Sequence, residues 1–383
     1  MKYLKYSLLS LGALVIMGCS TNASTSAAKI NIQEEKAQLG RSLYFDKNLS
    51  KNRTQACSTC HNPEAGFVDD RNNGVNKQAS LGDDGHSIGD RQAPSAAYAM
   101  FSPKFHYDEK KKEYIGGQFW DGREATLAGQ AGGPPTNPAE MGMSSKKETV
   151  QRIQENKFYE KQFIKLYGQE IFSNPKQAYS AMASSIEAFE QTAEFAPFDS
   201  KYDRHLDGKY DLTPLEDLGK SLFFSNANNS CASCHMLKGE DKKGETFTNY
   251  EFHNIGTPAN SELRAKNGVT AVDLGLLNNP AVSDIIHKGK YKVPTLRNVA
   301  ITGPYMHNGV FAELRTVVEF YNKYNDKTKT INPETKKVWN DPEVKENINI
   351  DDLKAKKQNE RKMEALVAFM KLLTDKRYEH LIK

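Results

Sequence analysis

The sequence predicts a mainly α-helical protein built from two similar domains, and three observations support this fold class. Apolar residues recur at helical spacing in residues 148–168, 176–195 and 363–373, whereas no comparable run alternates as a strand would. The segment Leu39-Gly-Arg-Ser-Leu-Tyr-Phe45 returns as Leu218-Gly-Lys-Ser-Leu-Phe-Phe224, and each copy precedes a Cys-x-x-Cys-His motif. A chain of 383 residues is also long enough for two buried cores.

The first element in order is an export signal in residues 1–18. Lys2 and Lys5 precede a short apolar run that ends at Gly18-Cys19. The stretch Ile-Met-Gly-Cys resembles a bacterial lipobox, in which the cysteine is lipidated, and the apolar run is too short to span a membrane. We therefore expect a periplasmic protein that is lipid-anchored through Cys19. The alternative is an ordinary signal peptide with an incidental cysteine.

The mature chain is expected to hold a tether and two domains. Residues 19–29, rich in Ser, Thr and Ala, are typical of a flexible tether. A loop-like stretch at 195–203 separates the two repeats, which predicts domains at 30–198 and 199–383. Thr213-Pro-Leu-Glu216 forms a capping box with proline at the first helical position, so a helix should begin there.

The distribution of charge excludes a nucleic-acid-binding protein. The formal net charge of +4 falls to about +2 once the two lysines of the signal are removed. Basic residues are interspersed with acidic ones, as in residues 107–114, and form no stripe that could bind phosphates. Glycine, proline and asparagine gather at 116–122, 131–142 and 301–309, which predicts loops that carry the functional residues.

The cysteines point to covalently bound haem. Apart from Cys19, the chain has two pairs, and a histidine follows each pair directly: Cys57, Cys60 and His61, and Cys231, Cys234 and His235. In a Cys-x-x-Cys-His motif two thiols attach haem through its vinyl groups and the imidazole binds iron. A zinc site would have to combine pairs far apart in sequence and would not explain the histidines. Disulfides within an exported protein are the weaker alternative.

Several spaced motifs in the same order carry a family resemblance. Besides the two haem motifs these are QFWDGR at 118–123, GQAGGPPTNPAEMG at 129–142, FHNIG at 252–256 and VPTLRNVAITGPYMHNG at 293–309. Together they resemble the bacterial di-haem cytochrome c peroxidase family, which includes the di-haem, MauG-like branch that matures methylamine dehydrogenase. The resemblance covers nearly the whole mature chain. It implies two cytochrome c-like domains, each with one covalently attached c-type haem.

The resemblance implies that the first motif holds the peroxidatic haem. On the far face of that haem the family places a glutamine and a glutamate, which match Gln130 and Glu140. Cleavage of the O–O bond needs a proton taken from one oxygen and delivered to the other, which is a task for a positioned carboxylate. Gln130 would orient the peroxide by hydrogen bonding. Without the resemblance, Glu140 would be taken for a solvated loop acid.

The resemblance also implies a route for electrons between the haems. Trp120 matches a tryptophan that lies between the two haems and can carry electrons from the second to the first. The alternative is a tryptophan that packs in the interface between the domains.

The second axial ligand of the second haem separates the branches of the family. In the peroxidases proper a methionine lies 14 residues beyond the histidine that corresponds to His307, and Tyr321 occupies that place here. Tyrosine at this place is the pattern of the MauG-like branch, so we expect Tyr321 to bind the second haem iron. Met306 is the competing ligand, because a thioether often pairs with histidine in cytochromes c. Tyr321 also falls in phase with apolar residues on a helix, so a core tyrosine is a further alternative.

Two other features of the family are altered in this chain. Many members cap the resting peroxidatic iron with a histidine, and His86 lies near that place but two residues closer to Arg91 than the family spacing, so we do not expect it to bind. The family also binds one calcium ion between its domains. The matching positions are Gln92, Thr302 and Pro304, where glutamine replaces the family's asparagine and retains an oxygen ligand.

These features predict a periplasmic di-haem cytochrome c peroxidase that reduces hydrogen peroxide to water with electrons from a small cytochrome or a similar donor. The first alternative is a MauG-like di-haem oxidase that modifies a protein or a small molecule through high-valent haem and Trp120. The second is a non-enzymatic di-haem electron carrier, against which Gln130 and Glu140 argue. A homodimer is one candidate assembly.

Overall fold

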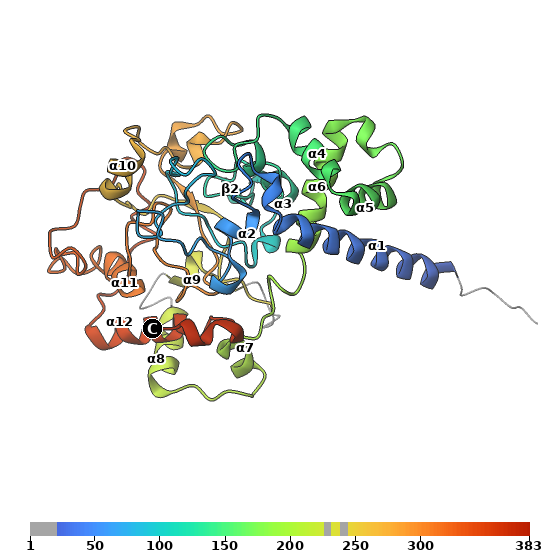
Figure 1. Cartoon of the computed structure of the whole chain (residues 1–383). Helices are drawn as coiled ribbons and strands as arrows, with labels where there is room; N and C mark the ends of the chain where they lie inside the picture. Colours follow the sequence, from blue (N-terminus) through green and yellow to red (C-terminus); the bar gives the residue numbers. More distant parts are fainter. Residues whose placement is uncertain (1–20, 226–230, 238–243) are drawn as a thin grey trace, which may run out of the picture.

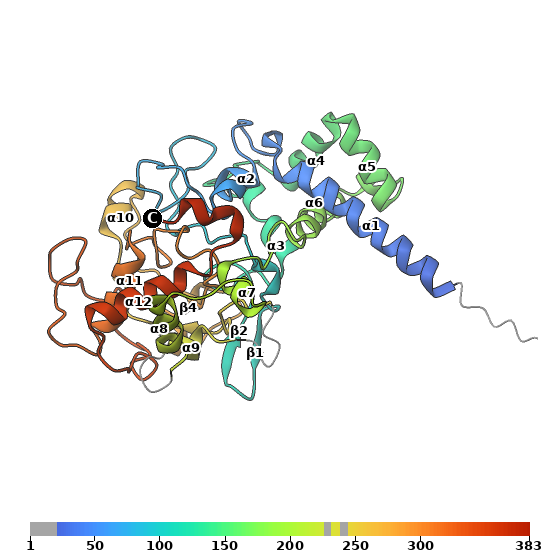
Figure 2. The same ribbon diagram turned by 90° about the horizontal axis from the view of Figure 1, so that it is seen from below.

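The computed structural model describes residues 21–225, 231–237 and 244–383. Helices at two ends enclose a middle region of loops and short strands (Figures 1 and 2). The α-helices are α1 (Thr21–Tyr44), α2 (Cys57–Cys60), α3 (Leu127–Ala131), α4 (Lys146–Glu155), α5 (Lys157–Tyr167), α6 (Pro175–Glu190), α7 (Lys201–Leu206), α8 (Pro214–Phe223), α9 (Cys231–Cys234), α10 (Ser261–Asn267), α11 (Leu314–Asn322) and α12 (Glu360–Lys371).

The strands are few and short, and all are antiparallel. β1 (His106–Asp108) pairs with β2 (Glu113–Ile115), and β3 (Phe252–His253) pairs with β4 (Tyr291–Lys292). The predicted mainly α class is confirmed.

The predicted helices are present, but two of them differ in extent. The segment 176–195 is helical only as far as Glu190, where α6 ends. The segment 148–168 forms two helices, because Asn156 ends α4 and its side chain accepts a hydrogen bond from the Phe158 N–H to begin α5. Asparagine is well suited to this position, since its short side chain caps free N–H groups. The capping box at the start of α8 is confirmed, because the Thr213 side chain accepts from the Glu216 N–H and the Glu216 side chain accepts from the Thr213 N–H.

The repeated Leu-Gly-x-Ser-Leu segment explains how the helices pack. A Cβ atom at Gly40 would lie 1.8 Å from the Ser185 carbonyl oxygen, and one at Gly219 would lie 1.9 Å from the Ala365 carbonyl oxygen. Both distances are far below van der Waals contact, so only glycine allows these backbones to approach so closely. A glycine at the same place in the repeat therefore allows close packing of α1 against α6 in the first half and of α8 against α12 in the second half.

Two large apolar clusters lie on either side of the middle region. The first unites α1, α4, α5 and α6, and its fully buried members include Leu43, Tyr44, Phe67, Phe163, Met182 and Phe195. The second unites α8, α11 and α12, and its buried members include Phe223, Phe247, Leu366, Phe369, Leu372 and Leu373. Each cluster reaches one cysteine of a haem motif, Cys57 or Cys231, so each motif is supported by its own core.

Polar contacts join the two halves. Arg91 donates from Nη1 to Asp121 at 2.7 Å and from Nη2 to Asp273 at 2.7 Å. At the C-terminus, Tyr378 donates to the Pro63 carbonyl at 2.5 Å. The end of the chain therefore packs beside the first haem motif.

A buried ion pair fixes the VPTLRN segment. The Arg297 side chain is fully buried and donates to both carboxylate oxygens of Asp203, at 2.6 and 2.9 Å, and to the Glu245 carbonyl at 2.6 Å. Removing one partner of a buried pair leaves an uncompensated charge. We expect Arg297→Met to lower the free energy of unfolding by about 3–5 kcal/mol.

Denaturant unfolding of the holoprotein measures this effect. Arg53→Met is the matched control, because the Arg53–Glu155 pair is exposed and should be worth less than about 1 kcal/mol. Equal losses in the two variants would contradict the structural role of Arg297.

The N-terminal part of the chain differs from its expected form. Helix α1 begins at Thr21 and projects from the body in both views, so it includes most of the segment expected to be a tether. The alanines of this segment favour a helix. Cys19 and the signal at residues 1–18 lie outside the described residues. Within the described residues, no helix is long and apolar enough to cross a membrane.

Candidate haem sites and the cavity between them

The first haem motif presents a fixed histidine. Cys57 and Cys60 lie on the single turn of α2, and His61 follows at its end. His61 Nδ1 lies 3.2 Å from the Phe67 carbonyl oxygen, and the Tyr44 hydroxyl donates to the His61 carbonyl at 2.9 Å. Because Nδ1 is bonded to the backbone, Nε2 is the nitrogen left to bind a metal.

The second haem motif repeats this arrangement. Cys231 and Cys234 lie on α9, and His235 Nδ1 lies 2.9 Å from the Phe247 carbonyl oxygen. Phe67 and Phe247 are both fully buried, with φ of 57° and 54°. Sequence reasoning missed both carbonyl partners, because a backbone acceptor has no residue signature.

Burial keeps the histidines and cysteines neutral. Desolvation lowers the pKa of His61, and it lowers the pKa of His235 to about 4, so both imidazoles are unprotonated and able to bind a metal. Burial raises the pKa of Cys60 and of Cys234 to about 11. Within the described residues, no group of three or more His, Cys, Asp or Glu side chains is placed to hold a metal ion. The four described cysteines are also free of disulfides.

A large cavity opens next to the first motif. It has a volume of about 580 Å³ and is lined by Cys57, Cys60 and His61 together with Gln130, Glu140 and Trp120. Gln130 lies on α3, and Glu140 lies in the loop that follows a 3-10 turn at Pro134–Thr136. The structure therefore brings every residue predicted for the first site to one cavity.

Two glutamates in this cavity have raised pKa values. Burial raises the pKa of Glu140, while the charge of Arg123 and a hydrogen bond from Asn137 oppose the rise. Burial also raises the pKa of Glu190, to about 8, and the nearby Glu187 adds to the effect. Sequence reasoning missed Glu190, which ends α6 among apolar residues and lines the same cavity.

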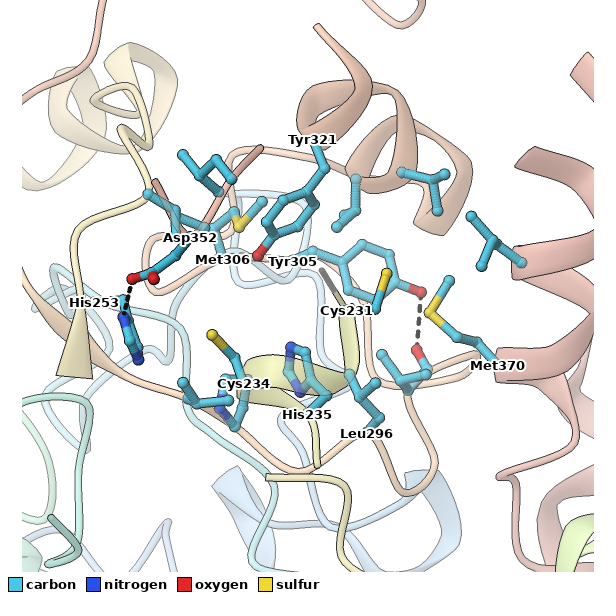
Figure 3. A pocket seen from close by; sticks show the side chains of 18 of the residues that line it. Cys231, Cys234, His235, His253, Leu296, Tyr305, Met306, Tyr321, Asp352 and Met370 are labelled. Atoms are coloured by element: carbon cyan, nitrogen blue, oxygen red, sulfur yellow. Dashed lines mark hydrogen bonds and ion pairs between the residues drawn. The ribbon is translucent and has the colours of Figure 1, made fainter. Parts of the chain in front are cut away.

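A second cavity of about 220 Å³ surrounds the second motif. Figure 3 shows Tyr321 entering this cavity from α11, with its hydroxyl pointing toward the side occupied by Cys234 and His235. No described residue forms a hydrogen bond with the Tyr321 hydroxyl. Burial raises the pKa of Tyr321 well above its ordinary value, so the phenol will ionise only beside a positive charge. Met306 lines the same cavity.

Trp120 lies between the two haem motifs. It lines the cavities of both motifs and a smaller cavity between them of about 150 Å³. Its indole N–H donates to the Gln92 carbonyl at 2.8 Å, and its own carbonyl accepts from the Lys292 N–H at 2.9 Å. These bonds fix the ring in the position from which it can contact both sites.

His86 and the three residues predicted to bind calcium lie in different parts of the structure. His86 is exposed on a turn and does not line the first cavity. Gln92, Thr302 and Pro304 all line the small middle cavity, and Gln92 Nε2 lies 3.3 Å from the Thr302 carbonyl oxygen. An amide and two carbonyls match the hard oxygen ligands that calcium prefers. The calcium site stays a prediction.

Comparisons with known proteins agree with this architecture. A family described as di-haem cytochrome c peroxidase matches residues 34–211. The methylamine utilization protein MauG of Paracoccus denitrificans is 45% identical over 91% of this chain and 90% of its own length. The chain belongs to the di-haem cytochrome c peroxidase family. The Escherichia coli cytochrome c peroxidase Ccp is 33% identical over 77% of this chain, and the match spans 55% of that protein.

A solved structure supports the same assignment. The diheme peroxidase BthA from Burkholderia thailandensis has a TM-score of 0.81 and 28% identity, covering 91% of this chain and 88% of that chain. Membership of the di-haem peroxidase family implies two c-type haems and two cytochrome c-like domains. The residues present fit this cofactor, because each motif offers two thiols, a neutral histidine and an adjoining cavity.

Proposed function

We propose that this protein is a MauG-like di-haem oxidase of the periplasm, which withdraws two electrons from an external substrate and uses them to reduce hydrogen peroxide. With two protons the balance is one peroxide consumed and two water molecules formed. The observation that carries the proposal is the Tyr321 hydroxyl, which points into the second haem cavity and has no hydrogen-bond partner among the described residues. A phenol left unpaired in this way is suited to bind iron. The 45% identity to MauG supports the same branch.

When bound, the haems supply the iron that exchanges electrons with peroxide and substrate. The protein supplies proton transfer and orientation. Glu140 accepts a proton from peroxide and returns it to the departing oxygen, and Gln130 donates a hydrogen bond that orients the molecule. Trp120 passes electrons between the two sites.

A second candidate function is the peroxidase activity with a small cytochrome as electron donor. Met306 favours it, because its thioether lines the second haem cavity and could replace Tyr321 as the iron ligand. The relatives named as peroxidases support it as well.

The two functions differ in the reaction of the fully oxidised protein. One equivalent of peroxide, added with no reductant present, should change the absorption of both haem sites if the protein is a MauG-like oxidase. A peroxidase of the second kind should react only after its second haem has been reduced. No reaction of the oxidised protein, followed by rapid turnover with a reduced small cytochrome, would overturn the proposal.

A further inference from the structure

Lys292 is a cation at the junction of the two haem sites. It ends strand β4, and its side chain lines both the second haem cavity and the small cavity between the two sites. Its ammonium donates to the Gly117 carbonyl, and its backbone N–H donates to the Trp120 carbonyl. The side chain therefore lies beside the residue that is placed to connect the sites.

Lys292 forms no ion pair with a carboxylate among the described residues. Of the residues that the structure describes, five lysine and arginine side chains line the three cavities: Arg91, Arg123, Lys292, Arg297 and Lys356. The three arginines each form an ion pair with aspartate, and Lys356 is exposed to solvent. Among the described residues no carboxylate lies within ion-pair distance of Lys292. Lys292 is therefore neither paired with a carboxylate nor exposed to solvent, whereas each of the other four cations is one or the other.

An enclosed ammonium paired only with a carbonyl is unfavourable. Burial lowers the pKa of Lys292 to about 8, and the charge of Asp121 opposes the shift only in part. An anion in the adjoining cavity would offset this cost, since charges removed from water are tolerated when they are paired. The cofactor brings suitable anions, because every haem carries two propionate carboxylates.

We propose that Lys292 binds a propionate carboxylate of a haem, between the two haem sites and beside Trp120. The proposal rests on haem binding alone and holds for either function. It also has a consequence for electron transfer. Loss of an electron from Trp120 creates positive charge, which an unpaired ammonium nearby would oppose and a lysine–propionate pair would not. The first and the second haem are both possible sources of the carboxylate, and the experiment distinguishes them.

The test uses Lys292→Gln in the holoprotein, with two spectroscopic readouts. Removing a positive charge favours the oxidised form of a nearby haem, so the midpoint potential of the haem that provides the carboxylate should fall. The propionate bending band of the same haem should shift in the resonance Raman spectrum. The haem that shows both changes is the source. Lys292→Arg keeps the charge and should retain the wild-type band.

Lys290→Gln is the matched control. Lys290 is buried and two residues away, but it pairs with Glu113 at 3.3 Å and lines none of the three cavities. It should change neither readout. Unchanged potentials and propionate bands in Lys292→Gln would overturn the proposal. If Lys292→Gln binds no haem, full haem binding by Lys292→Arg would support the proposal, and failure of both variants would overturn it.

Discussion

Replacing Glu140 with glutamine is expected to slow peroxide consumption by about 10²–10⁴-fold, which is the usual contribution of a positioned general acid–base. Glutamine has nearly the same size and keeps the hydrogen-bonding reach, but it cannot accept and return a proton. The loop itself should stay in place, because its backbone is held by the Asp83 N–H, which donates to the Glu140 carbonyl at 2.7 Å, and by the Asn137 carbonyl. Both haem spectra should therefore be unchanged while turnover is lost.

The pH dependence gives a second readout of Glu140. Its pKa is raised by burial, so the carboxylate that must accept the peroxide proton is lost at a higher pH than for an ordinary glutamate. Activity should fall as the pH is lowered through this raised pKa and should level off above it, and the acid limb should disappear in Glu140→Gln.

Glu190 is the matched comparison for Glu140, because it lines the same cavity and also has a raised pKa. Glu190→Gln removes a carboxyl of the same kind from another wall of the site. If this variant loses turnover and Glu140→Gln does not, the proton-transfer role belongs to Glu190. Stopped-flow measurement of peroxide consumption distinguishes the two cases.

The site residues that could be predicted from the residues alone are those that lie close together in the chain. Cys57, Cys60 and His61 are neighbours in the chain, so their motif predicts a haem site without knowledge of the fold. The gathering of Gln130, Glu140 and Trp120 at one cavity is different. Their loops meet only because the fold brings them together, and they were found through the order of motifs shared with a family.

The parts that could not be predicted depend on the backbone and on distant partners. The carbonyls that bind the two histidines lie six residues after His61 and twelve after His235, so no shared spacing reveals them. The repeat shows Gly40 in the sequence. Glycine is required there because the Ser185 carbonyl of another helix lies too close for any side chain, and only the fold shows this contact. Lys292 likewise lies in a recognisable segment, yet only the fold shows that no carboxylate of the described residues pairs with it.

Tyr321→Phe is expected to change the absorption spectrum of the second haem, whereas Met306→Leu is expected to leave it unchanged. A phenolate oxygen is a hard anionic ligand that stabilises ferric iron, so the second haem should have a much lower potential than one bound by histidine and methionine. The oxidised wild-type protein should also lack the near-infrared band of methionine ligation. Phenylalanine should fit the site, because the Tyr321 hydroxyl has no hydrogen-bond partner among the described residues.

Tyr324→Phe is the matched control for this substitution. Tyr324 lies one turn beyond Tyr321, its hydroxyl donates to the Ile255 carbonyl at 2.9 Å, and it does not line the second haem cavity. Its loss should lower the free energy of unfolding by about 1 kcal/mol and leave both haem spectra unchanged. If Met306→Leu instead abolishes a methionine-type band, the ligand is Met306. The protein would then have a high-potential second haem that accepts electrons from a donor, and the peroxidase function would replace the oxidase function proposed above.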